Sequence, residues 1–154
     1  MKVEIIKQKE YNFLWVNGEL MMWDIPVERR AQKKLADQAS GDVLVAGYGL
    51  GVVQEYLSAN PKVNSIVTIE KFKEVVDEAE KAYGKLYGEI EIQDFFEFET
   101  NKKFDYVIGD IWKDIEEEAL DDYKKFKNKA QTLLKPNGKI LAWGQEFFEY
   151  LENK

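Results

Sequence analysis

Three glycines at alternate positions, Gly47, Gly49 and Gly51, directly follow a run of strand-forming residues at 42–46. Glycines let the backbone turn sharply and let a ligand approach the chain closely. Their spacing, G-x-G-x-G, differs from the G-x-G-x-x-G of dinucleotide-binding folds. Because a helix-like segment follows at once, the stretch predicts a ligand-binding loop between a strand and a helix. The alternative is a tight turn that serves packing alone.

An acidic residue ends the next aliphatic strand of the pattern, Val67-Thr68-Ile69-Glu70. A carboxylate at such a strand tip can accept hydrogen bonds from both hydroxyls of a ribose. With the glycine loop ahead of it, we expect Glu70 and the adjacent Lys71 to contact a nucleoside. The alternative for Glu70 is a solvated strand end.

Two further carboxylates follow later strands. Asp94 precedes Phe95, and this pair can bind an adenine amino group and cover the ring face; the alternative is a loop Asp that caps a turn. Asp110 ends the strand expected at 104–108 and is followed by Trp112. Since ligands in open α/β sheets bind at the carboxyl ends of the strands, we expect Asp110 to bind or deprotonate an amine, or else to cap a helix.

The composition limits which chemistry is available. The chain contains no cysteine and no histidine, which excludes thiolate sites and removes the most common general base and transition-metal ligand. Carboxylates, tyrosines, lysines or positioning alone must carry any catalysis, and no metal site is expected. The net charge of −7 disfavours a nucleic-acid partner and is compatible with cationic small molecules.

Length and hydropathy indicate one domain of ordinary globular type. The chain has 154 residues, which is a single-domain length. No apolar run is long enough to span a bilayer, and the charged residues at 1–7 do not resemble a signal peptide. We therefore expect a cytoplasmic protein with no membrane contact.

The elements that must position these residues begin with a small antiparallel unit. Residues 3–6, 11–16 and 19–23 are typical of strands, and Asn17-Gly18 is a strong hairpin signal. Residues 1–24 are thus expected to form an N-terminal β-hairpin extension. A small hairpin is marginal alone, so it must pack on the domain or on a second copy, and a homodimer through the hairpin is one expectation.

From residue 42 onward strands and helices alternate, after a first helix at 26–39. Further strands are expected at 43–46, 65–69, 89–93, 104–108 and 139–143. Further helices are expected at 50–59, 71–83, 115–134 and 145–152, with a turn at Lys135-Pro136-Asn137-Gly138. This alternation predicts an α/β fold: a Rossmann-like parallel sheet of about five strands with helices on both faces, in a domain at 25–154.

The glycine loop and the strand-end acids together resemble the class I S-adenosylmethionine-dependent methyltransferase superfamily over residues 42–143. Residues 43–51 look like its glycine-rich motif, and Glu70 and Asp94 stand where its ribose-binding and adenine-binding acids stand. Residues 104–112 look like its strand-four motif, and residues 133–141 are similar to the turn before its fifth strand.

This resemblance implies a cofactor and a set of site residues. The implied cofactor is S-adenosylmethionine or its decarboxylated form, and the implied catalytic residue is Asp110. The implied cofactor-binding residues are Gly47, Tyr48, Gly49, Gly51, Glu70, Lys71, Asp94, Phe95, Asp110 and Trp112.

Within that superfamily the front of the chain is similar to the spermidine synthases. Residues 11–20 look like their N-terminal strand and turn, and Val45 stands where most methyltransferases carry an acid. The chain departs from both families after its fifth expected strand, because residues 144–154 follow where an antiparallel strand pair is usual. We interpret the sequence as a spermidine-synthase-like member truncated at the C-terminus, without much of the usual substrate pocket.

Three functions are compatible with the resemblance. The first is an S-adenosylmethionine-dependent transferase, methyltransferase-like, that acts on a small, amine-bearing molecule. The second is an aminopropyltransferase that uses the decarboxylated cofactor, and the third is a non-catalytic nucleoside-binding or scaffold protein. Attack on a sulfonium-activated carbon needs little acid–base chemistry. Asp110, Asp24 or Tyr48 can take the proton of an amine acceptor.

Overall fold

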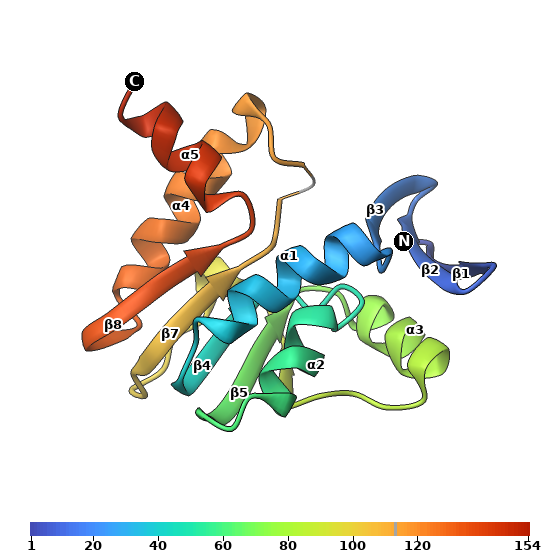
Figure 1. The fold of residues 1–154 in the computed structure, drawn as a ribbon, viewed down its shortest axis with the longest axis horizontal. Helices are drawn as coiled ribbons and strands as arrows, with labels where there is room; N and C mark the ends of the chain where they lie inside the picture. Colours follow the sequence, from blue (N-terminus) through green and yellow to red (C-terminus); the bar gives the residue numbers. More distant parts are fainter. Residues whose placement is uncertain (113) are drawn as a thin grey trace.

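A five-stranded parallel sheet forms the centre of the protein in the computed structural model, which describes residues 1–112 and 114–154 (Figure 1). The strand order is β6-β5-β4-β7-β8, and every neighbouring pair is parallel. The chain builds from β4 to one edge and then returns to the other side of β4, so a topological switch point lies between β4 and β7. The strands are β4 (Gly41–Ala46), β5 (Val63–Glu70), β6 (Glu89–Ile92), β7 (Phe104–Gly109) and β8 (Leu134–Ala142).

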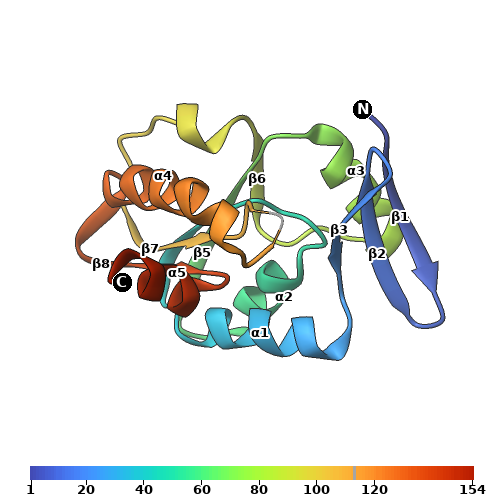
Figure 2. The same cartoon turned by 90° about the horizontal axis from the view of Figure 1, so that it is seen from above.

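Helices cover both faces of this sheet (Figure 2). Helices α1 and α2 pack on one face and α4 packs on the other, so the predicted α/β fold is confirmed. The helices are α1 (Pro26–Asp37), α2 (Val52–Ala59), α3 (Lys73–Tyr83), α4 (Leu120–Gln131) and α5 (Gln145–Glu152), with single 3-10 turns η1 (Phe95–Glu97) and η2 (Glu117–Ala119).

Helix α1 shows how the local sequence sets up the site. Pro26 occupies the first turn, where its missing N–H costs no hydrogen bond. Gln32, Leu35 and Ala36 are buried at helical spacing and turn one face of the helix toward the sheet. A polar residue on this buried face needs a partner, and Gln32 finds its partners in the cleft described below.

The N-terminal unit is a three-stranded antiparallel sheet. The turn between its second and third strands has positive φ at Asn17 (51°) and Gly18 (80°), as a type I′ hairpin requires. Leu14 packs with Val52 of α2 and Val75 of α3, and the first strand lies against α3. One face of this sheet is therefore buried on its own chain. Its strands are β1 (Val3–Gln8), β2 (Tyr11–Val16) and β3 (Glu19–Trp23).

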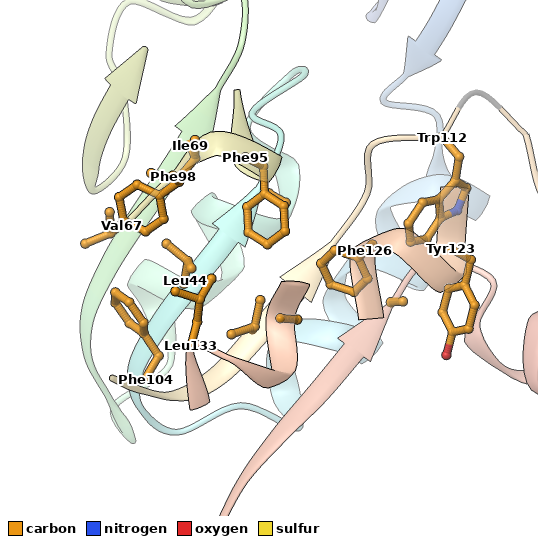
Figure 3. Packing of buried hydrophobic residues seen from close by; sticks show 14 of the residues in the cluster. Leu44, Val67, Ile69, Phe95, Phe98, Phe104, Trp112, Tyr123, Phe126 and Leu133 are labelled. Atoms are coloured by element: carbon orange, nitrogen blue, oxygen red, sulfur yellow. The ribbon is translucent and has the colours of Figure 1, made fainter. Parts of the chain in front are cut away.

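The largest hydrophobic cluster fills the space between the central sheet and α4 (Figure 3). Phe126 of α4 stacks on Phe95 with ring centroids 5.6 Å apart. Trp112 meets Tyr123 and Phe148 edge to face, with centroid distances of 5.7 and 5.4 Å. These aromatic contacts hold the segment after β7 against α4 and α5.

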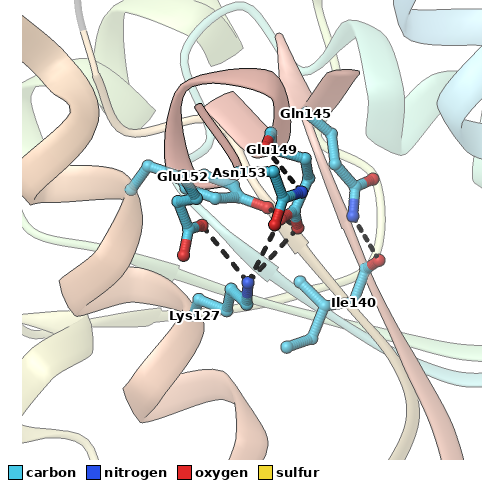
Figure 4. Close-up of polar contacts among 7 residues, drawn as sticks. Lys127, Ile140, Gln145, Glu149, Glu152 and Asn153 are labelled. Carbon is cyan, nitrogen blue, oxygen red and sulfur yellow. Dashed lines mark hydrogen bonds and ion pairs between the residues drawn. The ribbon is translucent and has the colours of Figure 1, made fainter. Parts of the chain in front are cut away.

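Polar contacts fasten α5 to α4 and β8 (Figure 4). Lys127 Nζ lies 3.3 Å from a Glu149 carboxylate oxygen, and the Tyr123 hydroxyl donates to Glu149 at 2.6 Å. Gln145 Nε2 donates to the carbonyl oxygen of Ile140 at 3.1 Å. Helix α5 is thus held on the domain by both helix and strand contacts.

The prediction of a turn at residues 135–138 is wrong, because these residues belong to β8. Since β8 is an edge strand, one of its sides has no neighbouring strand. Pro136 can lie in β8 because the N–H that proline lacks is not needed on that side. The register between β7 and β8 shifts once and absorbs this segment. Lys135 Nζ lies 3.0 Å from Asp105 and 3.4 Å from Asp42, which holds the segment beside the neighbouring strands.

The helix expected at residues 115–134 is shorter in the structure. Ile115 is 41% exposed, and η2 precedes α4, which begins at Leu120. The buried face of α4 starts with Tyr123 and continues through Phe126. Because tertiary burial supplies most helical stability in proteins, the exposed acidic stretch before Leu120 does not join the helix.

Candidate functional site

A cleft of about 600 Å³ opens at the carboxyl ends of β4, β5 and β7. This is the topological switch point, where open α/β sheets bind their ligands. Met22 of β3 and Glu28 and Gln32 of α1 also line the cleft, so the N-terminal sheet and α1 wall it opposite the strand ends. Except for Gly51, every residue predicted to bind the cofactor lines it: Gly47, Tyr48, Gly49, Glu70, Lys71, Asp94, Phe95, Asp110 and Trp112.

The glycine loop turns around the side chain of Tyr48. Gly47, Gly49 and Gly51 have φ angles of 94°, 55° and 71°, which residues with a side chain rarely adopt. The N–H of Gly51 donates to the carbonyl of Tyr48 at 2.8 Å, and Gly51 is the N-cap of α2. A Cβ on Gly51 would come within 2.5 Å of the Tyr48 hydroxyl. Gly51 therefore serves the packing of the loop.

Gly49 has a different environment. A Cβ there would meet Sδ of Met22 at 2.8 Å and no other atom within 4 Å among the residues described. Met22 is itself a flexible cleft residue on β3. The backbone at Gly49 is therefore the part of the loop that a ligand can approach closely.

Tyr48 is a packing residue of the loop. Its ring is 4% exposed, and its hydroxyl accepts a hydrogen bond from the N–H of Tyr87 at 3.2 Å. Burial raises the pKa of Tyr48. A tyrosine that is harder to ionise is a poor proton acceptor, so the geometry disfavours the base role considered for Tyr48.

Glu70 fixes the loop and borders the cleft at the same time. Its Oε1 accepts from the N–H of Tyr48 at 2.9 Å, and its Oε2 accepts from the N–H of Phe72 at 3.0 Å. Each carboxylate oxygen can accept more than one hydrogen bond, so two ribose hydroxyls can still bind there. The adjacent Lys71 extends toward Asp94, with Nζ 3.8 Å from Oδ2.

Asp94 performs the turn-capping role that was its alternative, and it still borders the cleft. Its Oδ1 accepts from the N–H of Phe96 at 2.9 Å and caps η1. Phe95 is 4% exposed and stacks on Phe126 in the core. The partly exposed Phe96 lines the same cleft and is better placed to cover a ligand ring. Sequence reasoning missed Phe96, although the Phe95-Phe96 pair made it a candidate.

Asp110 is joined to α1 through an amide. Nε2 of Gln32 donates to Asp110 Oδ2 at 3.0 Å and to Glu28 Oε1 at 2.9 Å. Burial, and then the negative charge of Glu28, raise the pKa of Asp110 to about 7, while the Gln32 hydrogen bond acts in the opposite direction. Burial also raises the pKa of Glu28. Two carboxyls with raised pKa values in one cleft are typical of a functional site.

The raised pKa makes Asp110 a stability liability at high pH. An unfolded Asp ionises near pH 3.8 and the folded Asp110 near pH 7, so the folded state holds the extra proton and stability falls as pH rises through this window. We expect Asp110→Asn to remove this loss and to raise the free energy of unfolding at pH 8 by about 2 kcal/mol. Urea unfolding at pH 5 and pH 8 measures it. The exposed Asp37→Asn should keep the wild-type pH dependence, and an unchanged slope in Asp110→Asn would contradict the assignment.

Trp112 lies mostly in the core. It is 5% exposed, and its Nε1 donates to the carbonyl of Trp143 at 3.0 Å. Although Trp112 lines the cleft, its ring is packed against α4 and α5. Its geometry is that of a side chain that positions the segment after β7.

Asp24, the other candidate for proton transfer, does not line the cleft. It accepts hydrogen bonds from Asn12 and from the Tyr83 hydroxyl, and it is 3% exposed. This arrangement makes Asp24 a structural contact between the N-terminal sheet, α1 and α3.

Two searches of the described residues bear on metal and membrane binding. No group of three or more aspartate or glutamate side chains is arranged to hold a metal ion within residues 1–112 and 114–154. In the same part of the chain, the helices lack the combined length and hydropathy that a bilayer crossing needs.

Comparison with known proteins gives matches in structure. No protein-family model matches the chain, and no curated protein matches it in sequence. An S-adenosylmethionine-dependent methyltransferase from Clostridium acetobutylicum ATCC 824 matches with a TM-score of 0.58 and 21% identity, over 76% of this chain and 50% of that one. The CcbJ methyltransferase from Streptomyces caelestis gives 0.58 and 20%, over 76% and 49%. The chain shares the fold of these methyltransferases.

A third structure with this methyltransferase fold carries a bound cofactor. It is S-adenosylmethionine-bound CalS10, an amino pentose methyltransferase from Micromonospora echinaspora, with a TM-score of 0.54 and 14% identity over 75% of this chain and 49% of that one. At these identities the likeness is one of fold. The chain spans about half the length of these three solved structures.

The glycine loop is supported by a residue that the sequence analysis did not predict. Val45 is fully buried among apolar residues, and Gln54 of α2 supports the loop instead. Nε2 of Gln54 donates to the Gly47 carbonyl at 3.1 Å and to Thr68 Oγ1 at 3.2 Å. The sequence signal that could have identified Gln54 is a polar residue inside the apolar pattern of α2.

The cleft wall opposite the strands was also missed. It contains Met22 and Trp23 from β3 and Glu28 and Gln32 from α1. The signal for the last two is their i, i+4 spacing, which places two polar side chains on one side of a helix. Nothing local in the sequence shows that this side faces Asp110.

Proposed function

We propose that the cleft binds S-adenosylmethionine and that the protein is a methyltransferase for a small, amine-bearing molecule. One observation carries this proposal: Glu70, the acid at the end of β5, is hydrogen-bonded to the glycine loop inside a cleft at the switch point of a methyltransferase fold. Each of the other groups in the cleft has a place in this proposal.

The residues present fit the cofactor. The volume of about 600 Å³ lies within the usual range for small-molecule sites. Glu70 has acceptor capacity for the ribose hydroxyls, and Asp94 Oδ2 faces no hydrogen-bond donor closer than Lys71 at 3.8 Å among the described residues, which leaves it for the adenine amino group. Phe96 supplies an aromatic wall. When bound, the cofactor supplies a methyl group activated by a positively charged sulfur.

The chain's own residues then supply a proton acceptor and exclude water. Asp110, with a pKa of about 7, is suited to accept a proton from an amine acceptor near neutral pH. Met22, Ile111 and Trp143 line the cleft and exclude water from its interior. In-line positioning supplies much of the remaining rate enhancement, so the absence of histidine is compatible with activity.

An amine acceptor is supported by charge. The acids Glu28 and Asp110 lie together in the cleft, and the chain has a net charge of −7. CalS10, which has the same fold, is described as an amino pentose methyltransferase. These observations favour a cationic small-molecule acceptor over an acidic one and over nucleic acid.

The other functions remain alternatives of lower support. The matched structures named above are methyltransferases, so aminopropyl transfer by a spermidine-synthase-like protein rests on residues 11–20 and on Val45 alone. A non-catalytic nucleoside-binding protein would bind the cofactor without turnover. A homodimer is proposed through the outer face of the N-terminal sheet, where Ile6 is 42% exposed. A cytoplasmic location is proposed from composition.

Calorimetry with S-adenosylmethionine, its decarboxylated form and S-adenosylhomocysteine tests the proposal directly. We expect binding of the first and third ligands, whereas preference for the decarboxylated form would favour aminopropyl transfer. Mass spectrometry for S-adenosylhomocysteine formation with a panel of small amines then separates turnover from simple binding. If none of the three ligands binds, both enzymatic functions are excluded.

A variant of Asp94 tests how the adenine is held. Asp94→Asn keeps a carbonyl oxygen that can cap η1 but replaces the second acceptor with a donor, so we expect the dissociation constant of S-adenosylhomocysteine to rise about tenfold. The exposed Glu97→Gln makes the same charge change in the same turn and should leave binding unchanged. Equal affinities for Asp94→Asn and wild type would remove Asp94 from the site.

A further inference from the structure

Three polar side chains on one wall of the cleft form a connected group: Glu28, Gln32 and Asp110. Gln32 is fully buried, and its amide nitrogen uses both hydrogens, one for Glu28 at 2.9 Å and one for Asp110 at 3.0 Å. Turning the amide over would place its oxygen between two carboxyls, which is unfavourable when both are ionised. The amide orientation is therefore fixed by its neighbours.

This orientation leaves an acceptor unused. Gln32 Oε1 is buried and has no hydrogen-bond partner among the described residues. Within residues 1–112 and 114–154, hydrogen bonds also leave Glu28 Oε2 and Asp110 Oδ1 unengaged. A buried unpaired acceptor costs about 1–3 kcal/mol, so a native structure that keeps one needs an explanation.

The group also carries charge that the described part of the chain does not balance. The buried Asp24 has Arg29 at 3.7 Å, and the half-buried Asp105 has Lys135 at 3.0 Å. In the same set of residues, neither Glu28 nor Asp110 forms an ion pair with a lysine or arginine. Glu28 and Asp110 are both half-buried, and a half-buried pair of acids is stabilised when a cation joins it.

We propose that Glu28, Gln32 and Asp110 form a subsite for an aliphatic amino group that enters the cleft with a ligand. An ammonium group has three hydrogen-bond donors and a positive charge. Three oxygens of this group, Gln32 Oε1, Glu28 Oε2 and Asp110 Oδ1, have no hydrogen-bond donor among the described residues, and two of them belong to carboxyls. The match in number and in charge is what a Lys-like ammonium requires and what a hydroxyl or a carboxylate ligand does not satisfy.

The amino group has two possible sources, given the function proposed above, on which this inference rests. It belongs either to the amino-acid part of S-adenosylmethionine or to the acceptor. The two sources share the same chemistry, and binding measurements can separate them without any assay of turnover.

The experiment is calorimetric titration of wild type, Glu28→Gln and Asp110→Asn at pH 7.5. S-adenosylhomocysteine carries the amino group, and 5′-methylthioadenosine is a related nucleoside without it. In addition, 2-aminoethanol and 1,4-diaminobutane are titrated into the free protein and into protein saturated with S-adenosylhomocysteine. Asp37→Asn, on the exposed side of the same helix, is the control with the same change of charge.

We expect Glu28→Gln to weaken the amino-bearing ligand about tenfold and to leave 5′-methylthioadenosine within about twofold. If S-adenosylhomocysteine is the weakened ligand, the subsite holds the cofactor's amino group. If instead the amines lose binding to the saturated protein, it holds the acceptor. Both variants retain the amide hydrogen bonds with Gln32, so thermal unfolding should show no loss of stability.

The proposal is overturned if Glu28→Gln and Asp110→Asn bind every ligand as the wild type does. Failure of the proposed function has a different pattern. There, neither nucleoside binds the wild type, while any Glu28-dependent binding of an amine would still support the subsite. Nucleoside binding without any Glu28-dependent amine binding would leave the proposed function and remove the subsite.

Discussion

Substitution of Gly47 by alanine is expected to abolish nucleoside binding in the cleft, with the affinity for S-adenosylhomocysteine reduced about a hundredfold or more. Gly47 has a φ of 94°. A Cβ there would lie 2.9 Å from the carbonyl oxygen of Asp110 and 3.1 Å from the Ile111 side chain. Because the nearest atom belongs to the backbone, the loop and the segment after β7 must move apart.

Movement of Gly47 would disturb the contacts that shape the site. Its carbonyl accepts from Gln54, and its N–H donates to the carbonyl of Ile69 at 2.9 Å. Glu70, the next residue along β5, holds the N–H of Tyr48. A shift at Gly47 therefore reaches the ribose-binding acid directly.

Gly84 offers a matched control for this substitution. It also has a positive φ, 77°, but a Cβ there would meet no atom within 4 Å in the described structure. Gly84→Ala should lower the free energy of unfolding by about 1 kcal/mol through backbone strain and should not change binding. Calorimetry and urea unfolding of both variants give the comparison, and a Gly47→Ala variant that binds as tightly as Gly84→Ala would refute the expectation.

Removal of the Asp24 carboxylate is expected to produce the largest loss of stability, about 3–5 kcal/mol for Asp24→Ala. Asp24 accepts from the N–H and the side-chain amide of Asn12 at 2.7 and 2.9 Å, and from the Tyr83 hydroxyl at 2.7 Å. Arg29 lies 3.7 Å away. The substitution leaves these buried or half-buried donors without their acceptor.

The pH dependence of this contribution has a definite sign. Burial alone would raise the pKa of Asp24, but the hydrogen bonds from Tyr83 and Asn12, with the charge of Arg29, hold that pKa below its ordinary value. The stability is therefore present above the unfolded pKa of 3.8 and is lost as the pH falls through the lower folded value.

Urea unfolding at neutral pH measures the Asp24→Ala effect. Asp37→Ala, which removes an exposed aspartate paired with Lys33, should cost no more than about 0.5 kcal/mol. Similar losses for the two variants would show that Asp24 contributes as an ordinary surface charge.

The sheet and the strand-end acids were predictable because they follow local rules. Aliphatic runs that alternate with helical segments predict a parallel sheet, and parallel strands bring their carboxyl ends to one edge. Glu70, Asp94 and Asp110 each follow such a run, and all three line one cleft. Their positions depend on the sequence within a few residues of each one.

The remaining features depend on contacts that are distant in sequence. Whether Phe95 or Phe96 faces the cleft is decided by the packing of Phe95 on Phe126, which lies 31 residues later in the sequence. The Pro-Asn-Gly segment at 136–138 had the composition of a turn, yet the open edge of the sheet lets it stay extended. Local propensity carries no information on either point.

The placement of β3 has a consequence for how the cleft takes up ligand. β3 forms part of the cleft wall, while Asp24 at its end ties the N-terminal sheet to α1 and α3. A ligand that contacts β3 stabilises the docked position of the whole N-terminal sheet. By the same linkage, docking of the sheet raises the affinity of the cleft for the ligand. Docking and binding are thus thermodynamically linked. We therefore expect Asp24→Ala to weaken ligand binding as well as stability, although Asp24 does not line the cleft.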